Sequence, residues 1–271
     1  MNSKERMREV ASGRGVAAAS HRWREGGLVL TCLAMLAGFM AWGPIAQNPA
    51  YHDFADRREL LSVPNLFDVA SNVPFLMVGI AGMALCAGRR RPPLAASWAT
   101  LFAGTALVSF GSGYYHWAPG NDTLLWDRLP MTVAFMGLFV ALVSEHLGEA
   151  LERFMLVPAV TVGVASAVWW HYTDDLRIYY WVQFTPLVCI PLALATFPGR
   201  YTHRIALLYG LALYVLAKLA ETWDREIFES TRNVVSGHTL KHVLAAGAVL
   251  AVLVMLWQRR PVVEPRLSTH P

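Results

Sequence analysis

The chain has 271 residues, of which 55% are hydrophobic and 15% are charged, and its formal net charge at pH 7 is +4. The apolar residues gather in blocks close to the ~20 residues that a helix needs to cross a bilayer, which is typical of an integral membrane protein. The positive charge lies between these blocks, so it indicates membrane topology and excludes a nucleic-acid partner.

The sequence predicts an all-α membrane protein with one membrane-spanning helix in each apolar block. The first block follows a basic tail over 1–25 and is interpreted as a retained transmembrane anchor, because it is longer than the apolar core of a signal peptide. The other seven form one bundle domain over 47–258, followed by a tail over 259–271. The eight blocks are 26–46, 68–87, 94–114, 124–145, 154–172, 178–197, 205–223 and 237–258.

The distribution of Lys and Arg predicts the orientation of these helices. Cytoplasmic loops of membrane proteins carry an excess of positive residues. With eight spans, the basic segments fall on one side, so we expect both termini in the cytoplasm and the protein in a bacterial inner membrane. These segments are the N-terminal tail, Arg89–Arg91, Arg200 with Arg204, and Arg259–Arg260. The three cysteines lie inside predicted spans, which argues against a disulfide framework.

Two motifs with histidine lie at the ends of predicted spans. Ser112 precedes His116 by four residues, and His238 precedes His242 by four, so each pair shares one helix face. Ionisable residues at membrane depth are costly and usually mark a functional site. Catalytic zinc commonly takes three protein ligands and leaves a position open, so the three histidines are candidate zinc ligands. Asp127 is the candidate general base, and Ser112 the candidate donor to the substrate carbonyl.

Each of these residues also has a structural interpretation. A single histidine in a span can simply bond to neighbouring helices. The Ser112 hydroxyl can bond to its own helix, and Asp127 can form an ion pair with Arg128. Two histidines on separate helices can also ligate haem, although His238 and His242 share a face and suit one small ion better.

The motifs resemble those of the alkaline ceramidases, which belong to a wider group of seven-helix membrane hydrolases related to adiponectin-receptor-like proteins. The resemblance rests on the Ser112–His116 motif, the Trp126–Met131 segment with its aspartate before Leu-Pro-Met, and the His238–His242 motif, with Ser71-Asn72 upstream. It implies a zinc amidase that cleaves the N-acyl bond of ceramide-like lipids. In such an amidase three histidines bind zinc, and a serine and an aspartate flank the water. The resemblance assigns these roles to His116, His238, His242, Ser112 and Asp127.

The resemblance also implies a calcium site ahead of the first core helix. The candidate ligands here are Asp53, Asp56 and Asn65, since calcium prefers oxygen ligands. Arg58 stands where a ligand is expected, and Asn65 where an acid is expected. The alternative is an ion-paired acidic loop in which Asp53 and Asp56 pair with the two adjacent arginines.

Further polar residues accompany these motifs. Lys218 and Glu221 share a helix face and are interpreted as an ion pair that could also line the substrate cavity. Lys241 and Gln183 are additional candidates for supporting roles. The expected partners are a lipid amide and the surrounding membrane lipids. The alternative function is a metal-containing receptor or signalling protein that keeps this fold without hydrolase activity.

Overall fold

The computed structural model describes residues 3–262, with side chains from residue 23 onward. Helices dominate this part of the chain, and it contains no β-strand. Two 3-10 helices, η1 (Pro49–His52) and η2 (Glu149–Leu151), join the longer elements. The α-helices are α1 (Ser3–Trp42), α2 (Leu66–Ala70), α3 (Val73–Ala87), α4 (Ala95–Trp117), α5 (Asn121–Leu147), α6 (Glu152–Thr173), α7 (Arg177–Thr196), α8 (Ala206–Thr222), α9 (Asp224–Ser230) and α10 (Gly237–Gln258).

The helices confirm the predicted all-α membrane bundle. Within the described residues, six segments are long and apolar enough to cross a membrane, namely Trp23–Trp42, Leu66–Ala87, Asn121–Leu147, Glu149–Thr173, Arg177–Thr196 and Gly237–Gln258. Helices α8 and α9 pass the same test together, although the chain bends by 82° between them. Helix α4 is 23 residues long but is not among these segments. Its Ser, Thr, Gly and His residues lower its apolar character, and many of them face the interior.

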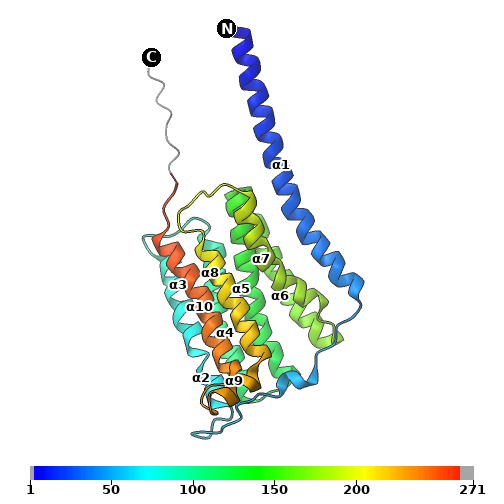
Figure 1. Cartoon of the computed structure of the whole chain (residues 1–271), viewed down its shortest axis with the longest axis vertical. Coiled ribbons are helices and arrows are strands. Elements are labelled where there is room, and N and C mark those ends of the chain that lie inside the picture. The colour runs from blue at the N-terminus through cyan, green and yellow to red at the C-terminus, as the bar shows by residue number, and fades with distance from the viewer. Residues whose placement is uncertain (1–2, 263–271) are drawn as a thin grey trace.

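The bundle is built around α4 and α5, which pack along one another (Figure 1). Helices α6 and α7 cover one side of α5, while α3, α8 and α10 complete the bundle on the other. Helix α1 lies outside this group and packs against α7, where the Sγ atoms of Cys32 and Cys189 are 3.8 Å apart. The first predicted span, 26–46, therefore lies beside the core as an additional helix. Its helical part ends at Trp42, before Gly43 and Pro44.

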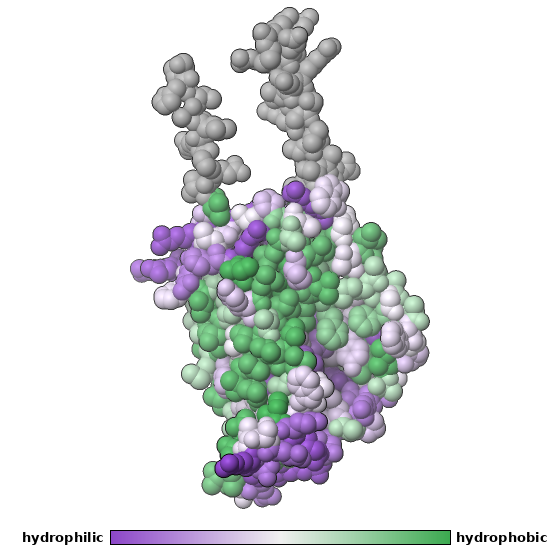
Figure 2. Space-filling model, in the orientation of Figure 1, coloured by the Kyte–Doolittle hydropathy of each residue, from purple (hydrophilic) through white to green (hydrophobic). Residues whose placement is uncertain are grey.

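The outer surface of the bundle is apolar between two polar ends, as Figure 2 shows for one face. Exposed Val, Leu and Phe side chains on the helices account for this surface. A broad apolar belt is expected where lipid tails replace water as the solvent.

One end of the bundle gathers the basic connections. The Arg259 guanidinium binds the Glu145 carboxylate at 2.7 Å and the carbonyl of Pro93 at 3.3 Å. Arg200 donates to the carbonyl of Glu145 at 3.1 Å, so the α3–α4 connection, the α7–α8 connection and the end of α10 meet there. The N-terminal end of α1 lies toward the same end (Figure 1).

The opposite end is closed by the segment that follows α1. The backbone N–H of Leu176 donates to the carbonyl of Ile45 at 2.8 Å, and the N–H of Gln47 donates to the Asp174 carboxylate at 2.9 Å. These bonds attach the segment to the α6–α7 connection. The chain then crosses this end of the bundle toward α2, covering the region where the predicted histidines lie.

Candidate active site

Two glycines allow the helices that carry the site to approach closely. A Cβ atom at Gly111 of α4 would lie 2.0 Å from the carbonyl oxygen of Trp126 in α5, and one at Gly237 would lie 2.1 Å from the carbonyl oxygen of Ala220 in α8. Neither position can therefore hold a larger residue without moving a helix. The first contact lies beside Ser112 and Asp127, and the second lies beside His238.

The structure brings His116 of α4 together with His238 and His242 of α10. One ring nitrogen from each histidine can be chosen so that all three lie within 4.8 Å of one another. All three side chains are buried, and both ring nitrogens of His116 lack a hydrogen-bond partner among the described residues. Buried polar atoms normally have partners, so the unpaired nitrogens of His116 are consistent with a group that could hold a metal ion. Three imidazole side chains are a donor set that fits zinc.

The other two histidines have fixed surroundings. Nδ1 of His242 lies 2.7 Å from the hydroxyl oxygen of Ser71, which itself donates to the carbonyl of Asp68 at 3.0 Å. This arrangement leaves Nε2 of His242 available for the cluster. The backbone N–H of His238 donates to the Asp224 carboxylate at 2.7 Å, and Nε2 of the same ring lies 3.3 Å from Nζ of Lys241.

Ser112 and Asp127 are both buried. The close contact at Gly111 brings their stretches of α4 and α5 together. Asp127 does not form the alternative ion pair with Arg128, since no such pair occurs among the described side chains.

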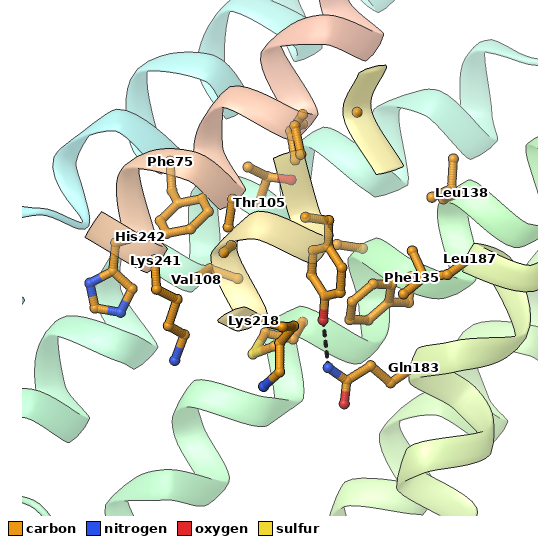
Figure 3. Close-up of a pocket in the computed structure, with 18 of the residues that line it drawn as sticks. Phe75, Thr105, Val108, Phe135, Leu138, Gln183, Leu187, Lys218, Lys241 and His242 are labelled. Atoms are coloured by element: carbon orange, nitrogen blue, oxygen red, sulfur yellow. Dashed lines mark hydrogen bonds between the residues drawn. The ribbon is translucent and has the colours of Figure 1, made fainter. Parts of the chain in front are cut away.

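A cavity of about 180 Å³ adjoins these residues. Ser112, Asp127 and His242 lie at its polar end. Apolar side chains from α4, α5, α7, α8 and α10 line the rest, including Leu138 and Leu187 (Figure 3). The lining of α10 continues from His242 to Val252, about 15 Å at 1.5 Å per residue. The cavity can therefore receive an extended apolar chain beside the histidines.

A cluster of charged side chains lies at the polar end of the cavity. The Glu221 carboxylate binds Lys241 at 2.6 Å. It also contacts Lys218, which is the ion pair predicted from the sequence. The hydroxyl of Tyr51 donates to Glu221 at 3.0 Å. Burial raises the pKa of the Tyr51 hydroxyl well above its usual range, and the Glu221 charge raises it further, so the hydroxyl remains a donor. The side chain of Gln183 instead donates to the hydroxyl of Tyr214.

The candidate calcium ligands have protein partners. Asp53 pairs with Arg57, and Asp56 accepts bonds from the Arg58 guanidinium at 2.8 and 2.5 Å. The bond to Asp56 raises the pKa of Arg58, which therefore stays charged. Asn65 donates to the carbonyl of His116 at 2.8 Å. This arrangement is the ion-paired loop that the sequence offered as the alternative, with Asn65 supporting a histidine instead.

Sequence reasoning missed several supporting residues. Asp68 is fully buried, and its carboxylate accepts bonds from Ser236 at 3.2 Å and Thr239 at 2.7 Å, which ties α2 to the start of α10. Asp224 links the loop at Ala55 to His238. An acidic residue inside an apolar block, as Asp68 is, was the signal available in the sequence. Its partners are more than 160 residues away, so the sequence did not identify them.

The fold and the site define a class of protein, namely an all-α multi-pass membrane protein with a buried three-histidine group beside an apolar cavity. The Ceramidase family model matches residues 62–265, and the chain belongs to this family. Membership implies a hydrolase that acts on the amide bonds of lipids. A comparison with curated proteins gave no significant match. A comparison with solved structures also gave none.

Proposed function

We propose that the protein is a zinc-dependent amidase that hydrolyses the N-acyl bond of ceramide-like lipids to a fatty acid and an amine. The observation that carries this proposal is the convergence of three buried imidazoles with Asp127 and Ser112 at one end of an apolar cavity. His116, His238 and His242 would hold the metal. Bound zinc supplies Lewis acidity, which activates water and polarises a carbonyl group.

The protein residues around this position have separate roles in the proposal. Asp127 accepts a proton from the attacking water and later delivers it to the leaving nitrogen. Ser112 donates a hydrogen bond to the oxygen that gains negative charge as the carbonyl carbon becomes tetrahedral. Their place in the lining of the same cavity supports a shared position at the scissile bond. Burial of both side chains excludes bulk water and strengthens these interactions.

The cavity supports a lipid as the substrate. Its apolar walls suit an acyl chain, and its polar end suits the amide group. Such a substrate can arrive from the membrane, since the surrounding helix surface is itself apolar.

The proposed orientation follows from the same geometry. The basic connections gather at one end of the bundle and the histidines lie at the other. On the positive-inside rule we propose that both termini lie in the cytoplasm and that the site lies near the outer face of the bacterial inner membrane.

Metal analysis combined with a lipid-amide hydrolysis assay tests this proposal. We expect purified protein to contain about one zinc ion per chain and to release fatty acid from a ceramide. Removal of the metal should abolish turnover, and added zinc should restore it. Zinc binding without turnover on any N-acyl lipid would favour the receptor alternative, and a haem absorption spectrum would contradict the zinc assignment.

A further inference from the structure

We propose that the cavity takes a lipid amide whose amine portion carries a carboxylate or phosphate group, and that Arg128 binds this anion. The inference rests on the proposed amidase function and names the substrate class of the same site. It depends on the surroundings of one buried arginine and on the balance of charge along the cavity.

Arg128 lines the cavity and is only 4% exposed. Its guanidinium carbon lies 3.8 Å from the ring centre of Trp170 and 4.8 Å from that of Tyr179, so two aromatic faces hold the group in place. Nη2 donates to Oε1 of Gln47 at 2.6 Å. Nη1 is buried and has no hydrogen-bond partner among the described residues.

The neighbouring carboxylates of the described residues do not pair with Arg128. Asp127 forms no ion pair with Arg128 among the described side chains, and Glu221 is shared by Lys218 and Lys241. Figure 3 shows the amino groups of both lysines pointing toward the same part of the cavity. The lining thus holds three cationic side chains, Arg128, Lys218 and Lys241, against two carboxylates, Asp127 and Glu221. A bound divalent metal would increase this positive excess.

An anionic ligand would give Nη1 of Arg128 a partner and would offset the excess positive charge of the lining. A carboxylate or phosphate oxygen can accept from Nη1 of Arg128, and guanidinium is suited to such planar or tetrahedral oxygen groups. A neutral ligand would leave Nη1 without a partner and the excess positive charge of the lining in place. With the acyl chain in the apolar part and the amide beside Asp127, the amine portion is the part of the lipid that reaches Arg128.

Two matched pairs of lipids test this inference in the zinc-loaded protein in detergent. N-acylglycine and N-acylethanolamine with one acyl chain differ in a carboxylate, and ceramide 1-phosphate and ceramide differ in a phosphate. Ligand affinity is measured from the shift of the melting temperature. We expect the anionic member of at least one pair to bind about 10-fold tighter or more, as for a hydrogen bond between charged groups. The pair that shows the preference identifies the anion.

Arg128→Gln should lower the ratio of the anionic-lipid affinity to the neutral-lipid affinity toward one. Arg153→Gln, which changes an exposed arginine on α6, is the matched control and should keep it. If Arg128→Gln does not melt cooperatively, Arg128→Lys replaces it. That variant keeps the charge but loses the paired donors, so it should retain only part of the preference. Equal or tighter binding of both neutral lipids to the wild type would overturn the inference, as would an unchanged preference in the Arg128 variants.

Binding and hydrolysis also separate this inference from the proposed function. Preferential binding of an anionic lipid without its hydrolysis would support the role of Arg128 and reject the amidase. Hydrolysis of neutral lipid amides without preferential binding of the anionic lipid would support the amidase and reject the role of Arg128.

Discussion

The hydroxyl oxygen of Ser71 lies 2.7 Å from Nδ1 of His242, so the junction between α2 and α3 fixes the ring of a candidate metal ligand on α10. A partner of this kind selects the tautomer that presents Nε2 to a metal and prevents rotation of the ring. The serine is 171 positions from the histidine along the chain. Its role therefore depends on the packing of α10 against the start of the bundle.

Ser71→Ala should weaken zinc binding by about 10- to 100-fold while the helices remain folded, because the ligand loses its orienting partner. Zinc affinity is measured by competition with a chelator. Ser97→Ala is the matched control, since Ser97 is buried at the other end of α4 and its hydroxyl has no partner among the described residues. Equal zinc affinity in Ser71→Ala and the wild type would contradict this role.

His116→Ala, His238→Ala and His242→Ala should each lose bound zinc and turnover together, because each removes one of three ligands. Zinc content is measured by elemental analysis, and turnover by release of fatty acid. His146→Ala provides a control, because His146 is also buried but its ring bonds to the carbonyl of Leu142 at 2.8 Å. A zinc-replete and fully active variant at any of the three positions would remove that histidine from the site.

Asp127→Asn should keep zinc but lose activity by about 100-fold or more, because the amide preserves the shape of the side chain but cannot accept the proton. The measurement is the turnover rate at saturating substrate, with zinc content determined on the same sample. Near-normal turnover would show that another group moves the proton.

Calcium should have little effect on the wild-type activity, because the Arg58 guanidinium already neutralises Asp56. Arg58→Asn removes that charge and adds an oxygen donor, so we expect it to increase the response to calcium. Arg57→Asn is the control, as it removes a similar charge that pairs with Asp53 instead. The test is a calcium titration of activity in all three proteins. A strong response in the wild type, or none in Arg58→Asn, would contradict this view of the loop.

Single cysteines at Asp122 and Glu229 should react with an impermeant thiol reagent added to intact cells, whereas one at Gly88 should not. All three positions are exposed, so a difference in labelling reports the side of the membrane. The native cysteines are first replaced to remove background. Labelling at Gly88 but not at the other two positions would reverse the proposed orientation.

The sequence alone predicted the helices of the bundle, because a span of about 20 apolar residues is a local property that the bilayer requires. It also identified the three histidines and Ser112 as candidates, since helical spacing places residues four apart on one face. Asp127 was a candidate because ionisable residues at membrane depth usually mark a site. The bend between α8 and α9 was not predicted. The break in the apolar pattern after Trp223 was visible, but a local pattern does not give the angle between two helices.

Only the tertiary structure decided which side chains meet. The contacts of Ser71 with His242, of Asn65 with the carbonyl of His116, and of Arg128 with Trp170 join segments far apart in the sequence. Arg128 follows Asp127 directly, and the sequence therefore allowed an ion pair between them. In the helix their side chains diverge by about 100°, and the guanidinium lies over aromatic rings instead of against the carboxylate. The packing of α6 and α7 against α5, which no local pattern contains, brought Trp170 and Tyr179 to the guanidinium.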